Sequence, residues 1–161
     1  MAAANQNPIT SAIMGVTLAG LRQITDERGA VLHMLRSDAP DFTRFGECYF
    51  SEVQPGAVKA WKRHRMQTQV LAVPVGRIRM VMYDDRAEST TKGQLQELEL
   101  GRPDAYLRLR IPPGVWYGFG CLGATPALLV NCADSPHDPH ESEVCPLNDP
   151  VIPYRWDGRT P

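Results

Sequence analysis

Residues 56–76 read GAVKAWKRHRMQTQVLAVPVG and place two extended segments between two glycines. The first segment ends in Lys62-Arg63-His64, and the second, residues 69–75, is nearly continuous and apolar. Alternate residues of a strand point to the same side, so Lys62 and His64 are predicted to share one face. An apolar run of this length is typical of a strand in the core of a sandwich or barrel. The stretch therefore predicts two strands of an all-β domain.

The rest of the chain repeats this pattern of short strands separated by turns. Its 14 prolines and 13 glycines interrupt any apolar period of 3.6 residues, so long helices are not expected. Residues 77–83 alternate, with Ile78, Met80 and Met82 on one face. Further strands are predicted at residues 31–35, 47–53, 95–100, 106–111 and 127–132. Strands at this spacing favour a sandwich or barrel.

Length and composition favour one globular domain and argue against several classes of protein. The chain has 161 residues, 43% of them hydrophobic and 22% charged, with a formal net charge of −1. We expect one domain over residues 1–161, with a polar lead-in at 1–14 and an irregular strap at 135–161. No apolar stretch is long enough for a bilayer, and no basic field or motif favours nucleic acid. Without an export signal or zinc spacing, the four cysteines are expected to be reduced thiols in the cytoplasm.

Two motifs point to a double-sheet barrel of the cupin type. The first motif of such barrels is a glycine, then His-x-His, then an acidic residue and a second glycine. Here Gly56 and Gly76 keep the spacing, but Lys62 and Gln69 replace one histidine and the acidic residue. The second motif, Pro-x-Gly-x-x-His, ends in Tyr117 instead of histidine. The spacing therefore predicts a cupin-type jelly-roll barrel, also called a double-stranded β-helix.

The altered residues argue against metal chemistry in this barrel. His64 together with Lys62, Gln69 and Tyr117 cannot form a two-histidine, one-carboxylate iron site or a three-histidine zinc site. We therefore expect neither a metal nor another cofactor. A metal-dependent cupin enzyme is the weakest of the alternative functions.

Four motifs resemble those of dTDP-4-dehydrorhamnose 3,5-epimerases, and the resemblance runs over roughly residues 15–157. They are residues 26–29 (DERG), 58–64 (VKAWKRH), 111–119 (IPPGVWYGF) and 147–150 (LNDP). The chain is most similar to the short, divergent members of that family. The resemblance implies a homodimeric, metal-independent epimerase or isomerase of a nucleoside-diphosphate 4-keto-6-deoxysugar, in deoxysugar or polysaccharide biosynthesis. Such enzymes remove the proton next to the ketone and return it on the other face.

The resemblance also implies roles for individual residues. Lys62 occupies the place of the family's base histidine, and Asp149 matches the aspartate that orients that base. Arg28 and Lys59 match basic positions that hold the diphosphate, and Arg28 is expected to reach into a neighbouring subunit. Tyr117 replaces a second pocket histidine and is a candidate acid.

The lysine in place of the base leaves two hypotheses open. Lysine side chains are cations at neutral pH and poor bases, because their ordinary pKa is about 10.4. His64 is the natural substitute base, whereas an ion pair between Lys62 and Asp149 would keep the shape of a pocket whose base is lost. The family's acid tyrosine aligns near Val130, so that role also looks vacant. The alternative function is therefore a catalytically depleted sugar-nucleotide-binding cupin, serving as a sensor or accessory subunit.

Charge and aromatic character suggest further contacts with the substrate. Basic residues gather at 59–65 and recur at Arg79, and strand alternation sends half of them inward. An anionic ligand such as a diphosphate explains this cluster, which makes Arg79 a candidate binding residue. Gln69, at the motif position of the acidic ligand, is a candidate binding residue of the polar pocket. Tyr83 and Trp116 are candidates for stacking on a base or a sugar face.

Overall fold

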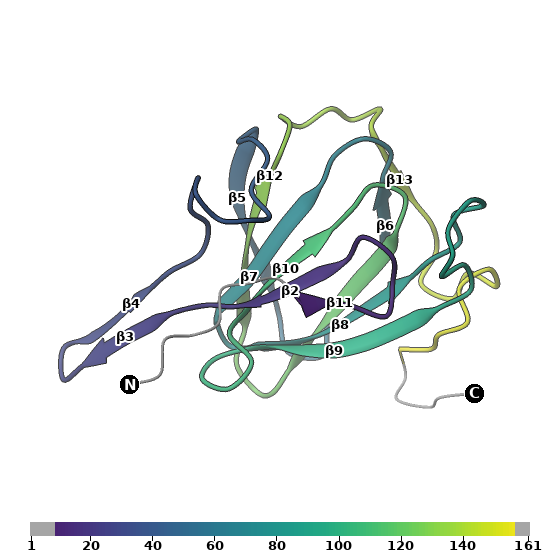
Figure 1. Ribbon diagram of the computed structural model, residues 1–161. Helices are drawn as coiled ribbons and strands as arrows, with labels where there is room; N and C mark the ends of the chain where they lie inside the picture. The colour runs from purple at the N-terminus through teal and green to yellow at the C-terminus, as the bar shows by residue number, and fades with distance from the viewer. Residues whose placement is uncertain (1–8, 157–161) are drawn as a thin grey trace.

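The computed structural model describes residues 9–156, which form two facing antiparallel sheets and a separate hairpin (Figure 1). The six-stranded sheet has the order β1 (Ile9–Thr10), β2 (Thr17–Gly20), β10 (Leu107–Ile111), β7 (Gln69–Val75), β12 (Ala127–Ala133) and β5 (Glu47–Val53). The five-stranded sheet has the order β13 (Ser142–Val144), β6 (Val58–His64), β11 (Trp116–Leu122), β8 (Arg77–Tyr83) and β9 (Leu95–Gly101). The hairpin, β3 (Gln23–Asp26) and β4 (Gly29–Leu32), projects away from the two sheets (Figure 1).

This arrangement confirms the predicted all-β, cupin-type jelly roll. Most neighbouring strands are not consecutive in sequence, because the chain passes repeatedly from one sheet to the other. The predicted strands at 47–53, 69–75 and 77–83 coincide with β5, β7 and β8. Within residues 9–156 there is no helix long and apolar enough to cross a membrane.

The main hydrophobic core fills the space between the two sheets. Ile78, Met80 and Met82 of β8 are fully buried there, as their alternation predicts. Leu71 of β7 and Leu109 of β10 reach the same core from the facing sheet. Apolar side chains that alternate along each strand thus hold the two sheets together.

A second apolar cluster covers the outer face of the five-stranded sheet. Trp61, Val81 and Trp116 project to this face and pack against Ile152 and Tyr154. The latter two residues belong to the C-terminal segment, which also contributes β13 to the edge of the same sheet. The C-terminal segment therefore contributes to packing and has a short strand in addition to its irregular parts.

A bulge in β6 decides which of its side chains face the interior. Tyr117 of β11 pairs with Lys62, and Phe119 pairs with Lys59, so two steps along β11 oppose three steps along β6. In a regular strand, residues three apart point to opposite faces. The extra residue turns both lysines toward the space between the sheets, where both line the same cavity.

Gly118 makes this bulge possible, and its replacement by alanine is expected to destabilise the fold. A Cβ at position 118 would lie 2.3 Å from the Cβ of Ala60 and 3.1 Å from the ring of Trp156. Overpacking of this kind costs about 1–3 kcal/mol, which urea titration would measure as a loss of unfolding free energy. Gly120→Ala on the same strand is the control, since its nearest atoms are 3.3 Å away. Equal losses in the two variants would contradict this role of Gly118.

The four cysteines are free, as expected from the sequence. Cys48 and Cys132 pair across β5 and β12, and their Sγ atoms are 3.3 Å apart. Burial, with the neighbouring Cys48 thiol, raises the pKa of Cys132. A raised pKa disfavours the thiolate, so this thiol is poorly suited to act as a nucleophile.

Candidate active site

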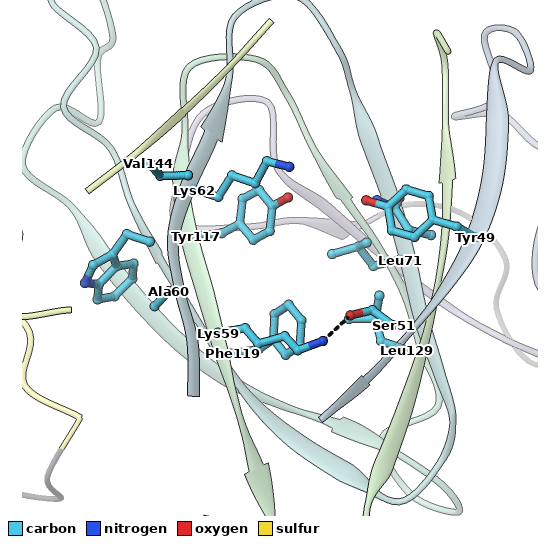
Figure 2. A pocket seen from close by; sticks show the side chains of 12 residues that line it. Tyr49, Ser51, Lys59, Ala60, Lys62, Leu71, Tyr117, Phe119, Leu129 and Val144 are labelled. Atoms are coloured by element: carbon cyan, nitrogen blue, oxygen red, sulfur yellow. Dashed lines mark hydrogen bonds between the residues drawn. The ribbon is translucent and has the colours of Figure 1, made fainter. Parts of the chain in front are cut away.

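A cavity of about 340 Å³ lies between the two sheets (Figure 2). Lys62 of β6 and Tyr117 of β11 project into it from one wall. Tyr49 of β5 projects from the opposite wall, beside Asn131 of β12. Apolar side chains make up much of the remaining lining, for example Phe119. The cavity is therefore a largely apolar site with a few polar groups directed at its centre, as is typical of small-molecule sites.

His64 lies behind Tyr117 and connects it to a carboxylate. The Nε2 atom of His64 is 3.1 Å from the Tyr117 hydroxyl, and the Nδ1 atom is 2.6 Å from Oε2 of Glu141. Oε1 of Glu141 accepts the backbone N–H groups of Met66 and Gln67, both at 2.7 Å. His64 is 5% exposed, so it reaches the cavity through the Tyr117 hydroxyl.

The direction of these hydrogen bonds follows from the protonation states. Burial would raise the pKa of Glu141, but the hydrogen bonds from Met66, His64 and Gln67 outweigh it and hold that pKa below its ordinary value. The ionised carboxylate can only accept, so Nδ1 of His64 carries the hydrogen and Nε2 is left as an acceptor. Tyr117 then donates its O–H to Nε2. Burial raises the pKa of Tyr117 far above its ordinary value, which keeps the phenol neutral.

The stability of the protein is expected to fall as His64 is forced to take up a proton. Burial lowers the pKa of His64 below its ordinary value, and the partly opposing effect of Glu141 does not cancel this. The unfolded chain therefore binds a proton that the folded chain does not. The stabilisation is complete above the ordinary histidine pKa of about 6.5 and is lost as the pH falls from there through the folded value.

Urea titrations between about pH 8 and pH 5 would measure this effect. Wild-type protein should lose more unfolding free energy on acidification than His64→Gln, which has no titrating group at this position. Parallel pH profiles for the two proteins would contradict the assignment of a neutral, buried His64.

The opposite wall carries a second hydroxyl that is held in place by buried amides. The side-chain N–H₂ of Asn131 donates to the Tyr49 hydroxyl at 2.7 Å and also to the Gln69 side-chain oxygen. Gln69 and Asn131 are each 1% exposed. Because the Tyr49 oxygen accepts from Asn131, its own O–H is left to donate into the cavity. Burial also raises the pKa of Tyr49, so this phenol too is a neutral donor.

The two lysines of the cavity differ in their partners. Lys59 is exposed and donates to Ser51 Oγ at 2.9 Å, crossing from β6 toward β5 (Figure 2). The side chain of Lys62 makes no hydrogen bond or ion pair with any residue between 9 and 156, although its backbone is paired with Tyr117 and Val144 of the neighbouring strands. The ion pair with Asp149 considered from the sequence is therefore not formed. Oδ1 of Asp149 instead accepts the backbone N–H of Val151 at 2.9 Å.

Four residues predicted to contact substrate lie away from the cavity. Arg28 is at the tip of the β3–β4 hairpin, with its side chain 83% exposed and bonded to Asp26. Arg79 pairs with Glu97 at 3.1 Å, and Trp116 donates to Asp85 at 3.0 Å. Tyr83 packs with Trp116 in the outer cluster. Arg79, Tyr83 and Trp116 occupy strand positions that alternate with the inward-facing ones, so they point to the outer face of their sheet.

Three residues of the site were not among those predicted from the sequence. Tyr49 alternates with Ser51 along β5, and both face the cavity, so a strand-by-strand count of polar positions could have found it. Asn131 is the one strongly polar residue in the apolar run of β12, which is also a usable signal. Glu141 lies 77 positions from His64, and no local pattern marks it.

Within residues 9–156, no group of three or more His, Cys, Asp or Glu side chains could hold a metal ion. The polar groups of the cavity are phenols, a serine hydroxyl, an amide and amines. Such groups are suited to proton transfer and to binding of oxygen atoms.

The chain has clear relatives along nearly its whole length. Residues 10–161 match the sequence model of the family described as dTDP-4-dehydrorhamnose 3,5-epimerase. The chain is 35% identical over 151 residues to the probable low-salt glycan biosynthesis epimerase Agl13 of Haloferax volcanii, a match covering 91% of this chain and 96% of the relative. It is 32% identical over 148 residues to the spore coat polysaccharide biosynthesis protein SpsL of Bacillus subtilis, covering 90% and 97%.

A solved structure is also very similar. The crystal structure of a dTDP sugar isomerase from Desulfovibrio desulfuricans G20 superposes with a TM-score of 0.92. The two sequences are 56% identical, and the match covers 94% of this chain and 96% of the other.

Proposed function

This chain belongs to the dTDP-4-dehydrorhamnose 3,5-epimerase family, and from that premise we propose that it epimerises a nucleoside-diphosphate 4-keto-6-deoxysugar. Glycan and polysaccharide biosynthesis is named for two of its relatives, and we assign this chain to the same kind of process. The observation that carries the proposal is the pair of hydroxyl groups, Tyr117 and Tyr49, on opposite walls of one cavity (Figure 2).

Two opposed proton-transfer groups are what an epimerisation needs. A carbon next to a ketone inverts when its proton leaves from one face and another proton arrives on the opposite face. On one wall, the Tyr117 oxygen accepts the carbon-bound proton while its own proton passes to Nε2 of His64. The resulting imidazolium is stabilised by Glu141 at 2.6 Å. On the other wall, Tyr49 donates a proton to the carbon.

The cavity mouth supplies a cation for the diphosphate. Lys59 is exposed there, and among residues 9–156 its ammonium group is bonded only to the neutral hydroxyl of Ser51. A phosphate oxygen forms a stronger, charge-assisted bond with this ammonium and would replace Ser51 as its partner. We therefore assign the diphosphate to the Lys59 end and the sugar ring to the region between Tyr117 and Tyr49.

Binding without turnover is the less favoured function. The lysine at position 62, and the absence near Val130 of the tyrosine that serves the family as acid, favour this alternative. Val130 packs in an outer cluster with Leu21 and Tyr106, whereas Tyr49 supplies a hydroxyl inside the cavity. His64 and Tyr117, both candidates from the sequence, together with Tyr49 thus provide proton-transfer groups in place of the family's histidine and tyrosine.

Solvent deuterium incorporation tests the proposed reaction. The protein would be incubated in D₂O with a panel of nucleotide-linked 4-keto-6-deoxysugars, and the sugars followed by NMR. Deuterium at C3 or C5, together with inverted configuration, is the expected result. If these sugars bind, as shown by calorimetry, but no carbon exchanges, the epimerase proposal fails and the binding protein takes its place.

We also infer a homodimer that uses the β3–β4 hairpin, acting in the cytoplasm. The hairpin projects from the barrel and exposes Val31 and Ile24, at 61% and 42% (Figure 1). Exposed apolar side chains beside Arg28 favour a protein partner at this hairpin. Sedimentation velocity should give a dimer for wild type and a shift to monomer for Val31→Asp. A wild-type monomer at micromolar concentration would contradict the inference.

A further inference from the structure

Lys62 is the cavity residue whose chemistry the proton-transfer groups leave unexplained. The charge of its basic neighbour Arg63 is neutralised, since Arg63 is bonded to Asp85 at 2.9 Å and to Glu143 at 2.6 Å. Lys62 instead projects into the cavity next to Tyr117, and no carboxylate of the described chain lies within ion-pair distance of it. A primary amine with no carboxylate partner among residues 9–156 therefore faces the region assigned to the sugar ring.

The surroundings of this amine are those of a nucleophile. Leu71, Phe119, Leu129 and Val144 contribute apolar surface to the cavity. Amines activated for attack on carbonyl carbon are found in apolar pockets or near a second cation, and Lys59 provides a second cation on the same strand. The substrate class of the proposed function brings a ketone into this cavity.

We propose that Lys62 forms a Schiff base with the ketone of the sugar, an inference that rests on the proposed keto-sugar substrate. The neutral amine adds to the carbonyl carbon and gives a carbinolamine. The hydroxyl group of the carbinolamine takes up a proton from solvent and leaves as water, and a protonated imine remains. Loss of a proton from a flanking carbon then gives an enamine, and a proton added to the other face restores the imine. Water adds to the protonated imine, and the ketone, the neutral amine of Lys62 and one proton are released.

This step explains how a lysine serves where a base is expected. The protonated imine draws electrons from both flanking carbons and so acidifies their hydrogens without any change in the base. The Tyr117–His64 pair lies on the wall that carries Lys62, and Tyr49 lies opposite (Figure 2). An imine at Lys62 would therefore present the faces of the flanking carbons to the two hydroxyl groups.

Reductive trapping tests the covalent step on the wild-type protein. A dTDP-linked 4-keto-6-deoxyhexose would be incubated with the protein and sodium cyanoborohydride, followed by peptide mass spectrometry. We expect Lys62 to gain the mass of the sugar nucleotide less one oxygen atom, with Lys59 of the same protein unlabelled as the internal control. Lys62→Arg keeps a positive charge but cannot form an imine, and we expect this variant to lose deuterium exchange.

The outcomes separate this inference from the proposed function. The Schiff base is overturned if wild type exchanges deuterium into the sugar without label on Lys62, or if Lys62→Arg exchanges deuterium at the wild-type rate. Either result leaves the epimerase function supported. Label on Lys62 without exchange supports the Schiff base and overturns the epimerase. If wild type shows no label on Lys62 and no deuterium exchange, both the Schiff base and the proposed epimerase function are overturned. The thermal unfolding of Lys62→Arg would be measured alongside, and the trapping result on wild type does not depend on that variant.

Discussion

Replacing Tyr117 by phenylalanine is expected to lower the rate of deuterium exchange by a factor of about 10² to 10⁴, the usual contribution of a positioned acid or base. The phenyl ring keeps the packing of the 7% exposed Tyr117 side chain, so the cavity wall should stay in place. What is removed is the oxygen that faces the cavity and connects it to Nε2 of His64. Substrate affinity should change little, because the phosphate contact assigned to Lys59 is untouched.

The companion variant is His64→Gln, which keeps Tyr117 but removes the group that takes its proton. This variant should also lose deuterium exchange. In any residual exchange, the dependence of the rate on pH should no longer show the step due to protonation of a histidine. Tyr117→Phe leaves the Nε2 atom of a buried histidine without a partner, which costs about 1–3 kcal/mol of stability, so unfolding must be measured in parallel. Exchange at the wild-type rate in a folded Tyr117→Phe protein would remove Tyr117 from the mechanism.

The strands could be predicted from the sequence where one face of the strand is apolar and the other is not. β8 shows this, because Ile78, Met80 and Met82 alternate with residues of the outer face. β11 (Trp116–Leu122) was missed because both of its faces are covered and its glycines resemble turn residues. Gly118 and Gly120 are in fact places where Trp156 and β6 come close to the strand.

The candidate site was only partly predictable, for two physical reasons. First, which face a residue occupies depends on strand irregularities, and the bulge in β6 that turns Lys59 and Lys62 to the same side has no sequence signature. Second, contacts between distant segments follow from the tertiary fold. Glu141 contacts His64 because β13 pairs with β6, whereas the family-like motif at residues 147–150 draws attention to Asp149, a carboxylate bonded elsewhere.

Tyr49→Phe is expected to separate exchange from inversion, which makes it the most informative variant of the site. The Tyr117 wall would still remove the proton from carbon, so an enamine or enolate would still form. Without the Tyr49 hydroxyl, that intermediate would be reprotonated from the wall it came from. The sugar should therefore gain deuterium with its configuration retained, while inversion falls by about a hundredfold or more.

Ser51→Ala is the matched control, since Ser51 lies on the same strand and lines the same cavity. Its hydroxyl accepts from Lys59 and is assigned no proton transfer, so exchange and inversion should both stay near the wild-type rates. NMR of the product sugars in D₂O reads label and configuration in one experiment. If Tyr49→Phe loses label and inversion in equal proportion, Tyr49 acts before proton removal, in binding or orientation of the sugar. If Tyr49→Phe inverts the sugar at the wild-type rate, the second proton comes from another group. The mechanism in which Tyr117 and Tyr49 act from opposite walls of the cavity is then wrong.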